Sequence, residues 1–173
     1  DGPFPEHYEP IESPIVHPLS NTQHNPTITI WRPEEIGTSD EYPIVATTYR
    51  VSEHWQAGQM TRNLPWMVEL MPEMFVEMSE ELADELGIEH AESVTVESKR
   101  GSIQAVAVIT KRFKPLQVNG ETIHQIGLPW HWGFRGLGVG DSANKLSPHV
   151  GDANTMIPEF KAFLVRVTKG GEA

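Results

Sequence analysis

Apolar and polar residues alternate along much of the chain, and this period of two predicts strands. The run from Tyr42 to Arg50 is short and β-branched, which is typical of a buried strand, and polar residues 52–54 follow it. Residues 94–96 and 103–109 alternate on either side of Lys99-Arg100-Gly101, which predicts two strands joined by a tight turn. Strands therefore dominate the expected fold.

The remaining pattern predicts a hairpin, a closing strand and a few short helices. Asn119-Gly120 supplies the two positive-φ residues of a type I′ turn, and residues 160–167 alternate again. Ser79 can cap a helix whose first turn is acidic and which Gly87 ends, whereas prolines allow only a short helix within 58–74. The elements together favour a mainly β protein with a few short helices, folded as a small barrel or sandwich.

The N-terminal segment differs from the rest of the chain. Its many prolines exclude helix and central strand, so we expect residues 1–33 to form an extended arm and residues 34–173 to form the barrel domain. The aromatic residues Phe4, Tyr8 and Trp31 suggest that the arm packs against a surface.

Composition limits the chemistry that the chain can support. The absence of cysteine excludes disulfides, cysteine zinc sites, iron-sulfur ligation and thiol nucleophiles. With 13 basic and 24 acidic residues, the formal charge of −11 makes nucleic acid an unfavourable partner. No apolar run reaches the length of a membrane span. The chain begins at Asp1 rather than at methionine, so we expect it to be a piece of a longer polypeptide.

Polar side chains gather directly after the strand at 42–50. Thr47, Thr48, Arg50 and His54, together with free backbone amides, form the donor set that holds a diphosphate without a metal. The same residues also suit ordinary strand and turn positions. Their spacing alone leaves both interpretations open.

Two further segments offer surfaces for a heterocycle. Residues 130–134, Trp-His-Trp-Gly-Phe, lead into a flexible glycine-rich loop and can either stack on a flat ring or plug a barrel end. Asp152 and Asn154 can read the edge of a guanine or pterin, or simply form an Asx turn. The histidines lack zinc-site spacing, and neither a nucleophile elbow nor a Walker loop occurs, so we expect no metal site and no catalytic residues.

A series of motifs in order along the chain carries a family resemblance. These motifs are Gly2-Pro3-Phe4-Pro5-Glu6-His7-Tyr8-Glu9-Pro10, 48–55, 94–101, 131–134, 144–146, 151–154 and 158–161. Together they resemble the C-terminal molybdopterin-dinucleotide-binding domain of formate dehydrogenase large subunits, in the dimethyl-sulfoxide-reductase family of molybdenum and tungsten enzymes.

The resemblance implies a double-psi β-barrel that holds the two molybdopterin guanine dinucleotides used to oxidise formate, with molybdenum or tungsten held by the rest of the enzyme. It also requires Arg50, His54 and Asn154 to border one cleft. In the family's usual Thr-Pro-Glu-Tyr-Lys motif, Ile157 and Phe160 here replace the two hydroxyl residues. The cofactor-binding residues implied by the analogy are Thr48, Arg50, Ser52, His54, Met60, Thr61, Arg100, His131, Trp132, Asn144, Asn154, Phe160 and Lys161.

In that family the metal-bound catalytic residue and the iron-sulfur cluster lie upstream of this domain. The resemblance therefore implies that the isolated chain is inactive, and that its partners are the remainder of the large subunit and an iron-sulfur electron-transfer subunit. It favours the periplasm over the cytoplasm. Two alternatives stay open: the cofactor domain of a nitrate or polysulfide reductase type of enzyme, and a non-catalytic β-barrel interaction module.

Overall fold

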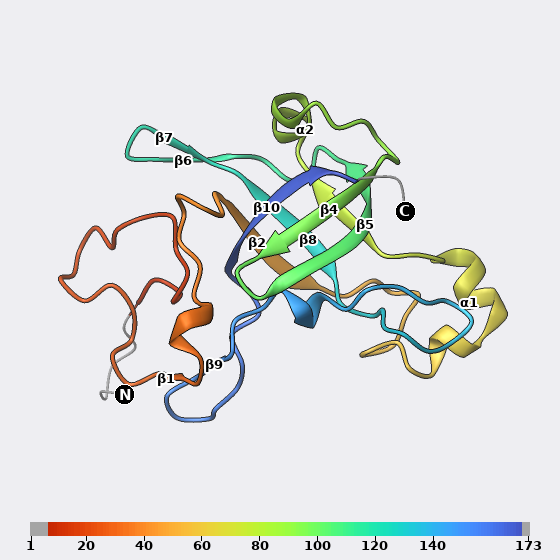
Figure 1. Ribbon diagram of the computed structural model, residues 1–173, viewed down its shortest axis with the longest axis horizontal. Coiled ribbons are helices and arrows are strands. Elements are labelled where there is room, and N and C mark those ends of the chain that lie inside the picture. Colours follow the sequence, from red (N-terminus) through yellow and green to blue (C-terminus); the bar gives the residue numbers. More distant parts are fainter. Residues whose placement is uncertain (1–6, 171–173) are drawn as a thin grey trace.

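The computed structural model describes residues 7–170, and a closed barrel forms its centre (Figure 1). Within these residues six strands hydrogen-bond around the barrel in the order β10-β2-β8-β3-β5-β4. This confirms the expected mainly β fold, with the expected double-psi barrel present as a closed six-stranded barrel. The strands are β2 (Ile44–Tyr49), β3 (Phe75–Met78), β4 (Ser93–Ser98), β5 (Gly101–Ile109), β8 (Gln125–Pro129) and β10 (Phe163–Lys169).

The barrel mixes parallel and antiparallel pairs, and this mixture positions the polar loops. Strands β2 and β8 run parallel, with Tyr49 opposite Pro129, and β3 runs parallel to β5. Parallel neighbours have their carboxyl ends at the same edge of a sheet. The residues that follow β2 and β8, at 50–54 and 130–134, therefore meet at one end of the barrel although they are distant in sequence.

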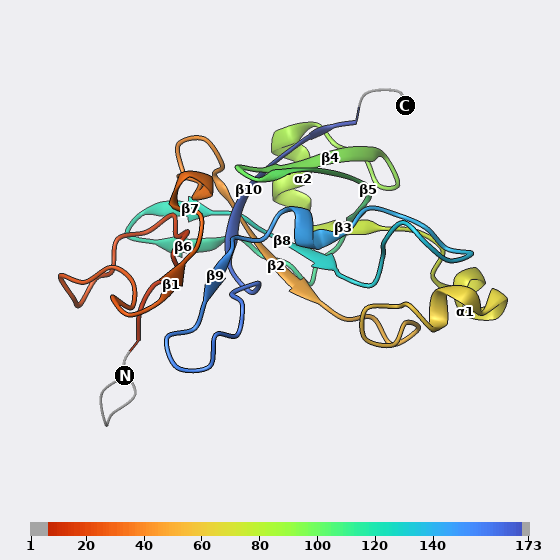
Figure 2. The ribbon, with the colours of Figure 1, turned by 60° about the horizontal axis from the view of Figure 1, so that its bottom comes forward.

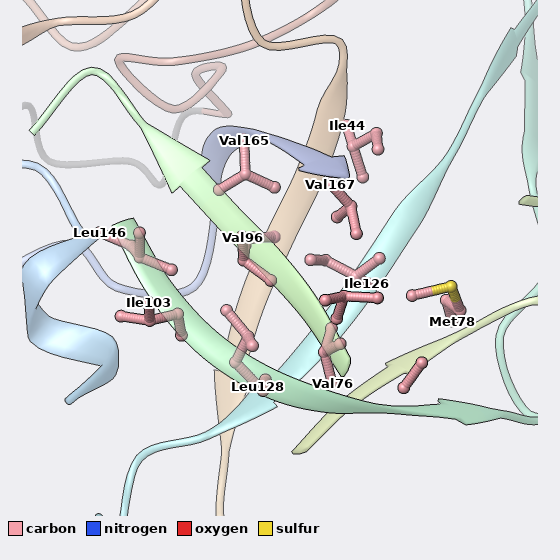
Figure 3. Packing of buried hydrophobic residues seen from close by; sticks show 14 of the residues in the cluster. Ile44, Val76, Met78, Val96, Ile103, Ile126, Leu128, Leu146, Val165 and Val167 are labelled. Carbon is pink, nitrogen blue, oxygen red and sulfur yellow. The ribbon is translucent and has the colours of Figure 1, made fainter. Parts of the chain in front are cut away.

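Side chains from all six strands fill the barrel (Figure 3). Alternate residues of β2 point inward, so that Ile44 and Ala46 are buried, and Val94 and Val96 do the same on β4. Each fully buried Val, Leu or Ile stabilises the fold by about 1.5–3 kcal/mol relative to an exposed one. The alternation read from the sequence is thus the alternation between core and surface.

One helix follows its predicted boundaries, and the short helix expected within 58–74 is present. Helix α2 (Glu80–Leu86) begins after Ser79, whose Oγ accepts a hydrogen bond from the Leu82 N–H at 3.1 Å, and it ends at Gly87. A 3-10 turn, η2 (Thr61–Asn63), leads into the short helix α1 (Pro65–Leu70), which projects away from the barrel (Figures 1 and 2).

The predicted hairpin is present as β6 (Leu116–Val118) and β7 (Glu121–Ile123), which pair around Asn119-Gly120. The closing strand β10 begins three residues later than predicted. The sequence did not predict β3, which is only four residues long, or β8, which contains Gly127 and ends at Pro129. Glycine and proline weaken strand propensity, so these two strands depend on their neighbours in the barrel.

The described part of the arm, residues 7–28, contains neither helix nor strand. It continues into β1 (Thr29–Ile30), which pairs with β9 (Val150–Gly151), and the 3-10 turn η1 (Pro33–Glu35) follows. Another such turn, η3 (Ala143–Lys145), precedes β9. The domain boundary at 33/34 stays a prediction, and Phe4 lies outside the described residues. Nothing helical between residues 7 and 170 combines the length and the apolar character that crossing a membrane requires.

Candidate functional site

Two cations lie next to a pair of aromatic rings just beyond the end of β2. The Arg50 guanidinium carbon lies 4.7 Å from the centroid of the Trp130 ring, and that ring stacks against Phe160 at 6.3 Å and 24°. Lys161 Nζ donates to the carbonyl oxygen of Thr48. Across residues 7–170, no carboxylate forms an ion pair with Arg50 or Lys161. We call Arg50, Trp130, Phe160 and Lys161 the cation-aromatic cluster; its positive charge is available to an anion.

The two cations interact electrostatically. Burial lowers the pKa of the Lys161 ammonium below its ordinary value, and the positive charge of Arg50 lowers this pKa further. An anion bound beside both groups would offset their mutual repulsion and raise the pKa of Lys161. The cluster is therefore suited to a phosphate-bearing ligand.

Three cavities adjoin the cation-aromatic cluster. The first, of about 870 Å³, is bordered by Arg50 and Ser52. The second, of about 560 Å³, is bordered by Phe160 and Lys161, and the third, of about 710 Å³, by Trp130. Different members of the cluster thus border each of the three cavities.

The third cavity contains buried donors without partners. Trp132 is 3% exposed and Arg62 is 5% exposed, and neither Trp132 Nε1 nor Arg62 Nε has a hydrogen-bond partner among the described residues. An unpaired buried donor destabilises a protein by about 1–3 kcal/mol, so two at one cavity indicate a ligand with acceptor atoms. Asn144 also borders this cavity.

Arg62 and Trp130 are the residues of this site that the sequence analysis missed. Arg62 Nη1 donates to the carbonyl oxygen of Gly133 at 3.0 Å and to that of Arg135, so it joins η2 to the glycine-rich loop. Its burial, which only the structure reveals, distinguishes it from an ordinary surface arginine. Trp130 belongs to the aromatic motif at 130–134, but only its neighbours His131 and Trp132 were predicted to bind the cofactor.

Two histidines that were predicted to bind the cofactor make hydrogen bonds within the protein. The ring nitrogens of buried His54 each lie 2.9 Å from an internal partner, Thr61 Oγ1 and the carbonyl oxygen of Met71. His131 is fully buried, and its Nε2 accepts the Val51 N–H at 2.8 Å. These contacts use the imidazoles within the chain, so both histidines hold the loops in position; their expected contact with a cofactor stays a prediction.

Arg100 has a structural environment. Its side chain is 6% exposed, and its guanidinium is bonded to Glu12 and to the carbonyl oxygens of Glu35 and Leu146. Because these internal acceptors occupy the guanidinium, the contacts give no support to the expectation that Arg100 binds a cofactor.

The remaining predicted residues lie on exposed loops. Met60 is 65% exposed, and Ser52 and Asn154 are also exposed. Asp152 Oδ1 accepts the Asn154 N–H at 3.0 Å and the Thr155 N–H at 2.8 Å, and these bonds lower the pKa of Asp152. The segment therefore forms an Asx turn, the simpler of the two interpretations of its sequence.

Arg50, His54 and Asn154 do not share one of these cavities, and the cofactor-binding role expected for each stays a prediction. Arg50 borders the first cavity, but His54 is buried within the protein and Asn154 lies on the Asx-turn loop, so they share none of the three cavities. The structure brings together a different set: Thr48, Arg50, Phe160 and Lys161 at the cluster, with Trp132 and Asn144 at the third cavity.

Comparison with known proteins decides the family. The model of the Molydopterin dinucleotide binding domain family matches residues 44–164, which is more than half of the chain. The chain belongs to this family. As a domain of this family it spans only 17% of the length of the two relatives described next.

The chain is 54% identical over 173 residues to formate dehydrogenase subunit alpha of Megalodesulfovibrio gigas, and 47% identical over 176 residues to the major subunit of the nitrate-inducible formate dehydrogenase of Escherichia coli (strain K12). Each match covers 98% of the chain. A periplasmic nitrate reductase of Desulfovibrio desulfuricans is 34% identical over 90 residues, and this match covers 50% of the chain.

The fold agrees with a solved structure of low sequence identity. Acetylene hydratase from Pelobacter acetylenicus superposes with a TM-score of 0.67 at 16% identity, covering 97% of this chain and 21% of that chain. At this identity the likeness concerns the fold alone.

The residues present fit a molybdopterin dinucleotide. The uncompensated charges of Arg50 and Lys161 suit a diphosphate, because ionised donors form the strongest hydrogen bonds to phosphate oxygens. The unpaired N–H groups of Trp132 and Arg62 suit a heterocycle rich in acceptor atoms.

Proposed function

We propose that this domain holds molybdopterin guanine dinucleotide in a formate dehydrogenase, where it serves the oxidation of formate to carbon dioxide. The observation that carries the proposal is the cation-aromatic cluster: Arg50 lies over Trp130, which stacks on Phe160, and the adjoining Lys161 donates to the Thr48 carbonyl oxygen. Neither cation pairs with a carboxylate among residues 7–170. When bound, the pair of dinucleotides supplies a molybdenum or tungsten redox centre that accepts the two electrons of formate. The rest of the enzyme holds the metal.

The residues of this chain bind and orient the cofactor. Arg50 and Lys161 neutralise the diphosphate, and the stacked rings of Trp130 and Phe160 shield it from water, which strengthens the electrostatic attraction. Trp132 Nε1 donates to an acceptor atom in the third cavity. Residues that contact formate lie outside this chain.

Formate dehydrogenase is favoured over other oxidoreductases by the pattern of identity. The formate dehydrogenase relatives match 98% of the chain at 47–54% identity, whereas the nitrate reductase matches half of it at 34%. We also propose that an iron-sulfur subunit accepts the electrons and that the enzyme is periplasmic. Co-purification and cell fractionation test these two points separately.

Replacing Arg50 by alanine in the longer polypeptide tests the cofactor site. Removal of a charged hydrogen-bond donor from a phosphate should weaken cofactor binding by roughly 1.5–3 kcal/mol, or about 10- to 150-fold. Released cofactor is measured as oxidised-pterin fluorescence together with guanine nucleotide, per mole of protein.

Arg166→Ala is the matched control for that experiment. Arg166 also lies over an aromatic ring, that of Tyr42 at 5.8 Å, but it pairs with Glu97 on the outside of the barrel. Its cofactor content should equal that of the unmodified protein. Equal cofactor content in Arg50→Ala and Arg166→Ala would exclude the proposed site.

A further inference from the structure

We propose that His7, Glu9 and His17 in the N-terminal arm bind a divalent ion of the zinc class. These residues lack a familiar ligand spacing, so no metal was expected from the sequence. The fold nevertheless brings one ligand atom from each of them within 4.8 Å of the others. Two imidazoles and a carboxylate form a ligand set typical of Zn²⁺, with one position left for water or a further ligand.

The distance between the first two ligands matches a tetrahedral site. His7 Nε2 and Glu9 Oε1 lie 3.4 Å apart. Zinc-ligand bonds of about 2.0–2.2 Å at tetrahedral angles place neighbouring ligand atoms about 3.3–3.6 Å apart. The pair therefore already has the spacing of two zinc ligands. His7 is exposed to solvent, which leaves room for a water molecule on the ion.

His17 is oriented as metal-binding histidines usually are. Its Nε2 lies 3.0 Å from the carbonyl oxygen of His7, and its Nδ1 accepts the N–H of Leu19 at 3.1 Å. Metal-bound histidines commonly donate their other ring N–H to a carbonyl oxygen. With Nε2 bonded to the His7 carbonyl oxygen, the proposed ligand atom is Nδ1, and metal binding would replace its bond to Leu19. Since Leu19 is 91% exposed, water can satisfy the released N–H.

The carboxylate of Glu9 is oriented in the same way. Ser13 Oγ can donate its one proton to Glu9 Oε2 at 3.3 Å or to the Ile15 carbonyl oxygen at 3.2 Å; the first bond leaves Oε1 directed toward His7. Such partners of a ligand hold it in position and raise metal affinity.

The backbone that carries the ligands is fastened by one residue, Gln23. Gln23 Oε1 accepts the His17 N–H at 2.8 Å, and the Gln23 carbonyl oxygen accepts the Glu9 N–H at 3.0 Å. A preformed loop loses less conformational entropy when it binds an ion. Glu12, which enters the protein interior to reach Arg100, lies between these ligands in sequence. An ion would thus stabilise the loop that places Glu12.

The test uses the longer polypeptide, treated with a chelator and then titrated with Zn²⁺ against a chromophoric competitor. The variant His17→Gln should weaken zinc binding by more than roughly 10-fold. Loss of a residue that only hydrogen-bonds to a metal ligand already weakens binding by about 10-fold, and His17 is itself a proposed ligand. The control His149→Gln removes an exposed histidine that stacks on Trp31 and should leave zinc binding unchanged.

Two further measurements keep the proposal testable if His17→Gln disturbs the arm. Ser13→Ala keeps all three ligands and should weaken binding by roughly 10-fold. Co²⁺ added in place of Zn²⁺ should give the visible absorption of a tetrahedral site, which His149→Gln retains. Equal zinc affinity in His17→Gln and His149→Gln, or no such absorption, would overturn the metal site. Pterin content, measured on the same samples, reports on the proposed cofactor function independently.

Discussion

At the scale of single residues, the ion pair between Glu12 and Arg100 is buried as completely as the core. The Glu12 side chain is 0% exposed and that of Arg100 is 6% exposed, and Glu12 also accepts the N–H of Gly37 at 2.5 Å and that of Leu164 at 2.8 Å. This one carboxylate joins the arm to the closing strand β10 and to the turn between β4 and β5.

Arg100→Met should therefore reduce the free energy of unfolding by about 3–5 kcal/mol, because it leaves the Glu12 charge buried without its partner. Urea denaturation measures the change. The adjacent Lys99 is the control, since its pair with Glu41 is exposed and Lys99→Met should change stability by about 0–1 kcal/mol. Similar unfolding midpoints for the two variants would contradict the structural role of Arg100.

His131 makes the loops beneath the site sensitive to acid. Burial is the main cause that lowers the pKa of His131 below its ordinary value of 6.5. Its Nε2 accepts the Val51 N–H, while Nδ1 bonds to the carbonyl oxygen of Gln56, so the neutral ring is the form that fits. Protonation of Nε2 would break the bond to Val51.

The consequence is a loss of stability in weakly acidic solution. In the unfolded chain this histidine takes up a proton below about pH 6.5, whereas in the folded chain it stays neutral to a lower pH. Its contribution to the free energy of unfolding is therefore fully present above about pH 6.5 and is lost as the pH falls toward the lowered pKa of the folded state. Melting temperatures between pH 7.5 and pH 5 should drop less steeply in His131→Gln than in the unmodified protein. The control His149→Gln, at an exposed histidine, should retain the original pH dependence. If the melting temperature of His131→Gln fell as steeply with pH as that of His149→Gln, His131 would not be the source of the acid sensitivity.

At the scale of elements, two glycines with similar backbone angles have very different surroundings. Gly87 ends α2 at φ +66°, and a Cβ added there would meet only Lys169 Cε at 3.9 Å. Gly58 has φ +74° in the loop after β2, but its Cβ would lie 2.2 Å from the carbonyl oxygen of His131. Both positions favour glycine because of their positive φ. Only at Gly58 does the loop that carries His131 also leave no room for a Cβ.

Gly87→Ala should lower the free energy of unfolding by about 1–2 kcal/mol, the cost of a left-handed conformation for an L-residue. Gly58→Ala should lower it further and should also reduce cofactor content, because the loop carrying Arg50 must move away from His131. Chemical denaturation and pterin fluorescence measure the two effects. If both variants were equally stable and retained equal cofactor, the contact between these loops would not matter.

At the scale of the whole molecule, this domain is a fraction of its relatives' length. It contains no cysteine, and we propose that the side chains at its cavities bind and orient the cofactor. We expect the purified 173-residue chain to show no formate-dependent reduction of a dye, whereas the longer polypeptide loaded with cofactor should show it. Formate-dependent dye reduction by the pure chain would contradict the proposal that the residues contacting formate lie outside it.

The sequence by itself determined the local elements and the family. Ser79, Gly87 and Asn119-Gly120 specify a helix start, a helix end and a hairpin through contacts within a few residues, and the strand alternation of β2, β4 and β5 follows from the two faces of a strand. The ordered motifs determined the relationship to the molybdopterin-dinucleotide-binding domains, which the match over residues 44–164 confirmed.

Only the tertiary structure decided which polar residues meet. Lys161 bonds to Thr48 across 113 positions of sequence, and Arg100 to Glu12 across 88, because closure of the barrel brings distant strand ends and the arm together. Burial then separated a structural arginine, Arg100, from an exposed one, Arg50, which we propose binds the cofactor. Local patterns do not encode such long-range proximity, since it depends on how all six strands pair.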